Sequence, residues 1–155
     1  MRTRAGTGTG RSGLRAGFVV AGAVVMACAP AFAMADAPDG AALYLDHCAA
    51  CHGADLEGAP DWSLPGPDGR LPAPPHDETG HTWHHGDGFL TDYVVRGGQA
   101  VLDELGVAWD SGMPAFGDIL RAEEIAAILD YIKTSWPPEI RAIQERTSAV
   151  EADRR

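Results

Sequence analysis

Cys48-Ala49-Ala50-Cys51-His52 is the stretch of this sequence that decides the fold. Two cysteines separated by two residues and followed by a histidine form the pattern that attaches a c-type haem. Residues at positions i and i+3 share one face of a helical turn, so both thiols can reach the vinyl groups of one porphyrin. The imidazole that follows can then bind the iron. The pattern therefore predicts one covalent haem c held by Cys48 and Cys51, with His52 as an axial ligand.

A Cys-x-x-Cys pair also occurs in thioredoxin-like dithiols and in zinc sites. The dithiol interpretation requires a strand–helix–strand context, which the flanking sequence does not have. The zinc interpretation requires a second pair of ligands, but the one other cysteine of the chain is Cys28. Because Cys28 lies in a segment that we expect to be removed, haem attachment is the preferred interpretation.

Residues 1–35 have the pattern of a secretory signal peptide. Arginines 2, 4, 11 and 15 precede an apolar run over residues 16–29 that is short for a membrane span. We expect cleavage after Ala35 and a periplasmic protein that begins at Asp36. Two alternatives remain open. In the first, the segment is not cleaved and serves as a membrane anchor. In the second, Cys28, whose preceding residues loosely resemble a bacterial lipobox, becomes a lipid-modified N-terminus.

The charge balance narrows the classes of partner. The chain has 12 basic and 22 acidic residues, and four of the arginines lie in the predicted signal. After cleavage, 8 basic and 22 acidic residues remain, which gives a net charge of −14. An acidic surface repels phosphate, so nucleic acid is excluded as a partner. Electrostatic steering favours redox partners with a basic docking surface. Membrane association is expected only if Cys28 is lipidated or the signal is retained.

Two segments have the pattern of amphipathic helices. The first, over residues 38–50, has Asp39 as a candidate N-cap and leads directly into the cysteine pair. The second, over residues 122–136, carries apolar residues at i, i+3, i+4, i+7 and i+11, namely Ile125, Ile128, Leu129, Ile132 and Trp136. We expect these two helices to provide most of the apolar packing.

The sequence between these helices is richer in turn-forming residues. The glycines and prolines of residues 53–88 exclude long helices and central strands, so this part should be a loop ordered by packing on the haem. Asp87 is expected to cap a short helix that ends near Arg96, at Gly97-Gly98, and residues 100–110 have a weak pattern. We predict an all-α cytochrome c-like domain over residues 36–137, with three to four helices wrapped around one covalent haem. Residues 138–155 are highly charged and predict a mobile tail.

Three blocks in this order resemble the class I cytochrome c family. They are Gly40-x-x-x-Tyr44-x-x-x-Cys48-x-x-Cys51-His52-Gly53, Met113-Pro114-Ala115-Phe116-Gly117, and Ile128-x-x-Tyr131-Ile132. The resemblance implies that Gly40 packs against the last helix and that Met113 is the distal iron ligand. It departs at Arg121, where the family often has Ser or Thr as N-cap. We also expect a proline within residues 72–75 to offer its carbonyl to Nδ1–H of His52.

Four histidines cluster in one short stretch of the loop: His76, His81, His84 and His85. One hypothesis is a second metal site for copper or zinc, with Asp77 and Glu78 nearby. Another is a structured loop in which the histidines cap backbone groups and Trp83 packs against the haem. A third is that one of them replaces Met113 as distal ligand. His47 is expected to be a surface residue.

An iron with one histidine and one methionine ligand is six-coordinate and closed to substrates, which suits outer-sphere electron transfer. We therefore predict a one-electron carrier of the bacterial cell envelope, with respiratory partners and without enzymatic activity of its own. The alternatives are a haem-based sensor or catalytic subunit with an open distal site, and a cytochrome that handles copper or zinc through residues 76–85.

Overall fold

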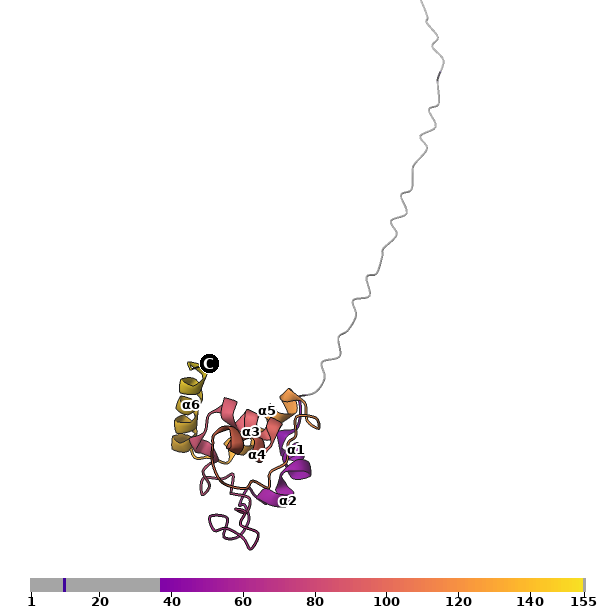
Figure 1. The fold of residues 1–155 in the computed structure, drawn as a ribbon. Coiled ribbons are helices and arrows are strands. Elements are labelled where there is room, and N and C mark those ends of the chain that lie inside the picture. The colour runs from indigo at the N-terminus through magenta and orange to yellow at the C-terminus, as the bar shows by residue number, and fades with distance from the viewer. Residues whose placement is uncertain (1–9, 11–36, 155) are drawn as a thin grey trace, which may run out of the picture. The chain divides into compact units, whose positions relative to one another are not determined.

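The computed structural model describes residue 10 and residues 37–154. The predictions about signal cleavage and Cys28 lie outside this range. Within it the domain is all-helical, without strands (Figure 1). The elements are α1 (Gly40–His47), α2 (Ala49–His52), a short 3₁₀ helix η1 (Thr82–His84), α3 (Asp87–Arg96), α4 (Gly98–Glu104), α5 (Ala122–Thr134) and α6 (Pro138–Ala152). None of the described helices is long and apolar enough to cross a membrane.

The helix predicted over residues 38–50 forms, but it divides at Cys48 into α1 and the single turn α2. Asp39 is the N-cap, as predicted, and its Oδ1 accepts hydrogen bonds from the backbone N–H groups of Ala41 and Ala42, both at 3.1 Å. Such a cap satisfies backbone donors that have no partner within the helix. It fixes where α1 begins and therefore where the cysteine pair lies.

Helices α1 and α5 cross at Gly40. A Cβ built on Gly40 would lie 2.1 Å from the backbone oxygen of Ala127, so no side chain fits there. One turn later, the fully buried ring of Tyr44 packs on Tyr131, with ring centroids 5.4 Å apart. This crossing confirms the role predicted for Gly40. The apolar stripe of α5 faces the same core, with the following residues buried: Ile125, Ile128, Leu129, Ile132 and Trp136.

The residues between α2 and η1 form a loop, as their prolines and glycines predict. Backbone hydrogen bonds hold it against the rest of the domain: Gly58 N–H donates to the carbonyl of His52 at 2.7 Å, and Ala59 N–H donates to that of Ala73 at 2.9 Å. The loop therefore folds back on α2 and brings the segment around Pro74 next to His52.

The prediction for α3 needs one correction. Asp87 is the first residue of the helix, and Gly86 is its N-cap. The Asp87 side chain points instead to α5 and α6. Its Oδ1 forms an ion pair with Nζ of Lys133 at 2.9 Å and accepts a hydrogen bond from Nε2 of Gln144 at 2.7 Å. Gly97, with a φ of 80°, ends α3 as predicted. The weakly patterned segment that follows it contains the short helix α4.

The expectation of a mobile tail over residues 138–155 is wrong. Pro138 begins the helix α6, in a position where its missing N–H costs nothing. Gln144 is 1 % exposed and its Nε2 donates to Asp87 Oδ1 at 2.7 Å and to Ser148 Oγ at 2.9 Å. The sequence pattern missed this helix because its packing depends on a buried amide and not on an apolar stripe.

Candidate haem site

The cysteine pair lies on one turn of helix. The backbone N–H groups of Cys51 and His52 both donate to the carbonyl of Cys48, at 3.1 and 3.0 Å. Both thiols are free, with Cys51 exposed and Cys48 partly buried. Burial, together with the neighbouring Cys51, raises the pKa of Cys48 to about 11, so this thiol is protonated at neutral pH. Both sulfur atoms are available for thioether bonds to one porphyrin.

His52 is buried at 8 % exposure and its ring is held by a hydrogen bond. Nδ1 lies 2.9 Å from the carbonyl oxygen of Pro74. Because a carbonyl can only accept, Nδ1 carries the proton and Nε2 keeps the lone pair that binds a metal. Burial lowers the pKa of His52, while the hydrogen bond to Pro74 acts against this. The structure thus confirms the predicted proline carbonyl and identifies it as that of Pro74.

His76 lies directly beside His52, a neighbour that sequence reasoning had not identified. The two imidazole rings stack with centroids 4.1 Å apart and planes inclined by 22°. His76 Nδ1 shares a hydrogen bond with Thr82 Oγ1 at 2.8 Å. Burial, with His52 and His81 nearby, lowers the pKa of His76 to about 3, so the ring is neutral under physiological conditions.

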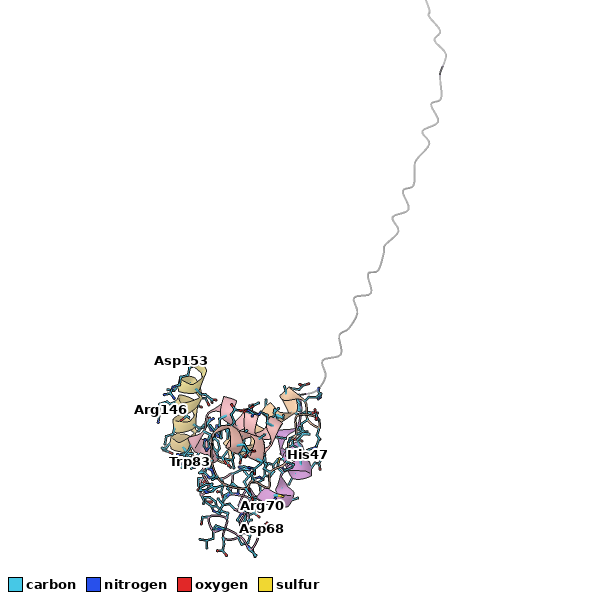
Figure 2. All side chains as sticks on the ribbon, in the orientation of Figure 1. His47, Asp68, Arg70, Trp83, Arg146 and Asp153 are labelled. Atoms are coloured by element: carbon cyan, nitrogen blue, oxygen red, sulfur yellow. The ribbon has the colours of Figure 1, made fainter. Side chains whose placement is uncertain are left out.

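The other histidines of the loop also contact aromatic rings, and the rings of His81 and His85 meet edge to face with centroids 5.7 Å apart. His81 stacks on Trp62 and His85 on Phe89, with centroids 5.8 and 4.4 Å apart. His84 stacks on Trp83 at 3.7 Å, and Trp83 lies close to α6 (Figure 2). Within residues 37–154, no three His, Cys, Asp or Glu side chains are arranged to hold a metal ion. These ring contacts, with the hydrogen bond between His76 and Thr82, order the loop, and the copper or zinc site stays a hypothesis.

His47 is less exposed than expected for a surface histidine. It is partly buried, and its ring meets that of Phe116 edge to face with centroids 6.3 Å apart. This contact connects α1 to the loop that carries Met113.

Met113 is partly buried and lies on a loop attached to α3 and α4 by backbone hydrogen bonds. Gly98 N–H donates to the carbonyl of Met113 at 3.1 Å, and Phe116 N–H donates to that of Val94 at 2.9 Å. Met113 N–H donates to Ser111 Oγ at 3.3 Å. A Cβ on Gly98 would lie 2.0 Å from that hydroxyl oxygen and 2.6 Å from the Tyr93 hydroxyl, so a larger residue here would displace these two side chains. The sequence suggested Gly98 as a helix stop, without indicating that it supports the loop.

Two thiols on one helical turn and a buried imidazole with a free Nε2 are the donor set that covalent haem requires. The family model described as Cytochrome c matches residues 37–136. The chain belongs to the cytochrome c family. No curated protein and no solved structure gives a significant match. As in the family, the cofactor of this cytochrome is one covalently bound haem c. The match ends before α6, which this cytochrome has in addition to the matched region.

Proposed function

We propose that this cytochrome is a one-electron carrier of the bacterial cell envelope, with His52 and Met113 as the axial ligands of its haem. Membership of the cytochrome c family indicates haem-based electron transfer in general. The observation that carries the finer proposal is that both candidate ligands are held by hydrogen bonds, His52 through its ring Nδ1 to the carbonyl of Pro74 and Met113 through its backbone carbonyl to N–H of Gly98. Ligands held in this way change position little between two oxidation states.

Each residue has a defined part in this proposal. Cys48 and Cys51 would attach the porphyrin, and His52 would bind the iron through Nε2 while the carbonyl of Pro74 restrains the Nδ1 edge of its ring. A thioether ligand such as Met113 favours the reduced state and raises the reduction potential. When bound, the haem supplies an iron that accepts and donates one electron. If His52 and Met113 both hold the iron, no position on it would remain open for a substrate, and the group would serve electron transfer only.

The location and the partners are also part of the proposal. The signal-like residues 1–35 support export to the periplasm, and a lipid on Cys28 would keep the protein on the membrane surface. A net charge of −14 after cleavage, from 8 basic and 22 acidic residues, supports docking to basic redox partners. Lys133 is the one lysine of the chain, and it is already paired with Asp87 and Asp130. The cytochrome therefore has no lysine surface with which to bind an acidic partner.

The test begins with haem attachment. Acid–acetone extraction should leave the haem on the wild-type chain, and Cys48→Ser with Cys51→Ser should abolish it. The oxidised protein should have the weak long-wavelength charge-transfer band of iron–thioether ligation and should not bind carbon monoxide. Met113→Ala should remove the band, lower the reduction potential and allow carbon monoxide to bind, whereas His81→Ala should change none of these. Carbon monoxide binding by the wild type would favour a sensor or catalytic subunit instead.

A further inference from the structure

His76 is held more firmly than a loop residue needs to be. Its backbone N–H donates to the carbonyl of Leu56 at 2.8 Å, and its own carbonyl accepts from Nε1–H of Trp136 at 2.7 Å. Its side-chain Nδ1 is bonded to Thr82 Oγ1 at 2.8 Å. Three hydrogen bonds to three different segments therefore fix both the backbone and the ring of this residue. Leu56, Thr82 and Trp136 are themselves buried, so the partner residue in each of the three bonds is shielded from water.

The ring fixed in this way lies against the face of the candidate iron ligand. The centroids of His52 and His76 are 4.1 Å apart and their planes differ by 22°. The hydrogen bond from Nδ1–H of His52 to Pro74 restrains one edge of that imidazole but does not by itself set the tilt of its plane. The flat ring of His76, stacked on the face of the His52 imidazole, supplies the restraint on this tilt. The edge of Tyr44 then supports His76 from another side, with ring centroids 6.3 Å apart.

We propose that His76 is a positioning residue whose imidazole, stacked on His52, sets the plane of the axial ligand and thereby the electronic state of the haem iron. This inference rests on the proposed role of His52 as a ligand. Partners in the outer shell of a metal site orient the ligands and tune the metal. In a haem, the direction of the axial imidazole plane decides how the unpaired electron of the ferric iron is distributed over the porphyrin. That distribution is measurable without any assay of electron transfer.

The chain allows a graded set of variants. His76→Phe keeps a flat ring against His52 but loses the hydrogen bond to Thr82, and His76→Leu loses the flat ring as well. Thr82→Val leaves His76 in place and removes its side-chain hydrogen bond. The matched control is His84→Leu, which removes a stacked histidine of the same loop whose partner is Trp83 and not His52. All four are made in the full-length, haem-loaded protein.

The readouts are the haem methyl proton resonances and the electron paramagnetic resonance anisotropy of the oxidised protein, together with the reduction potential. His76→Leu should rearrange the methyl resonances and shift the potential. Thr82→Val and His76→Phe, which both lose the side-chain hydrogen bond between positions 76 and 82 but keep a flat ring, should change both readouts in the same direction by less. His84→Leu should change none of them.

Several results would overturn the proposal. One is a His76→Leu protein that melts earlier but keeps the wild-type resonances and anisotropy, since that describes a purely structural residue. Another is equal changes in the Leu and Phe variants. If His76→Leu acquires no haem, Thr82→Val decides, and wild-type resonances in that variant refute the idea. Failure of the underlying ligand assignment would be seen separately, because the wild-type spectrum would then lack a histidine-ligated low-spin iron.

Discussion

Replacing Gly40 with alanine tests the helix crossing on which the domain depends. The added Cβ would lie 2.1 Å from the carbonyl oxygen of Ala127, 2.6 Å from its carbonyl carbon and 3.2 Å from Cβ of Tyr131. A carbon atom normally stays about 3.3 Å from a carbonyl oxygen, so α1 and α5 would have to separate by about 1.2 Å. The clash is with backbone, which cannot move aside by changing a rotamer.

Overpacking of this kind costs about 1–3 kcal/mol. Alanine regains at most about 1 kcal/mol, because it is a better helix former than glycine. We therefore expect Gly40→Ala to lower the free energy of unfolding by about 1–2 kcal/mol. Each kcal/mol lowers Tm by about 4–8 °C in a domain of this size, so Tm should fall by about 4–16 °C. The haem spectrum of the folded protein should stay the same, since Gly40 is remote from the ligand side chains.

Thermal unfolding followed by far-ultraviolet circular dichroism measures this loss, with the visible spectrum recorded on the same samples. Ala42→Val is the control, because it enlarges an exposed position of the same helix and should cost less than about 1 kcal/mol. A Gly40→Ala protein that melts at or above the wild-type temperature would refute the close crossing of α1 and α5.

Three further predictions concern the core, α6 and pH. Ile128→Ala, at a site 2 % exposed, should leave a cavity and cost about 2–5 kcal/mol in denaturant unfolding. Gln144→Leu should cost about 1–3 kcal/mol because the buried Gln144 amide donates to the Asp87 carboxylate and to Ser148 Oγ, and both acceptors lose that donor, whereas Glu145→Leu at an exposed position should cost much less. Burial, together with His81 and His84 nearby, lowers the pKa of His85, although Glu151 acts to raise it. The unfolded chain therefore takes up the proton first as pH falls below about 6.5, and stability is lost in that window by at most about 1.4 kcal/mol per pH unit. His85→Phe should make the loss shallower, and parallel wild-type and variant curves would contradict this.

The parts of the fold that follow from local chemistry could be predicted from the sequence. Asp39 caps α1 because a short acidic side chain satisfies the first backbone N–H groups. The stripe ending at Trp136 marks the buried face of α5, and Gly40 marks the close approach of two helices. Arg121, an unusual N-cap, is compensated by Glu124, whose carboxylate accepts from the backbone N–H of Arg121 at 2.8 Å.

The parts that depend on distant partners could not be predicted. Gln144 is buried because Asp87, 57 residues earlier, accepts its hydrogen bond, and no local pattern announces such a pair. The clustered histidines suggested a shared metal, yet His81 and His85 meet only edge to face, and each stacks on a different aromatic ring, Trp62 and Phe89. The contact of His76 with His52 likewise depends on how the loop folds back, which its prolines and glycines allow but do not specify.

The crossing of α1 and α5 also has a consequence for the order of events in folding. It joins the first and last helices of the region matched by the family, so the two contacting segments are far apart in the sequence. Forming this contact closes a loop that contains nearly the whole domain, and the conformational entropy lost in that closure opposes it. In the export proposed above, α1 would leave the membrane before α5 and would have no partner with which to pack. Cys48 and Cys51 follow α1 directly and are therefore accessible on a mobile chain at that stage. The topology thus leaves an interval for haem attachment to the two cysteines before the last helix arrives and the domain closes around its cofactor.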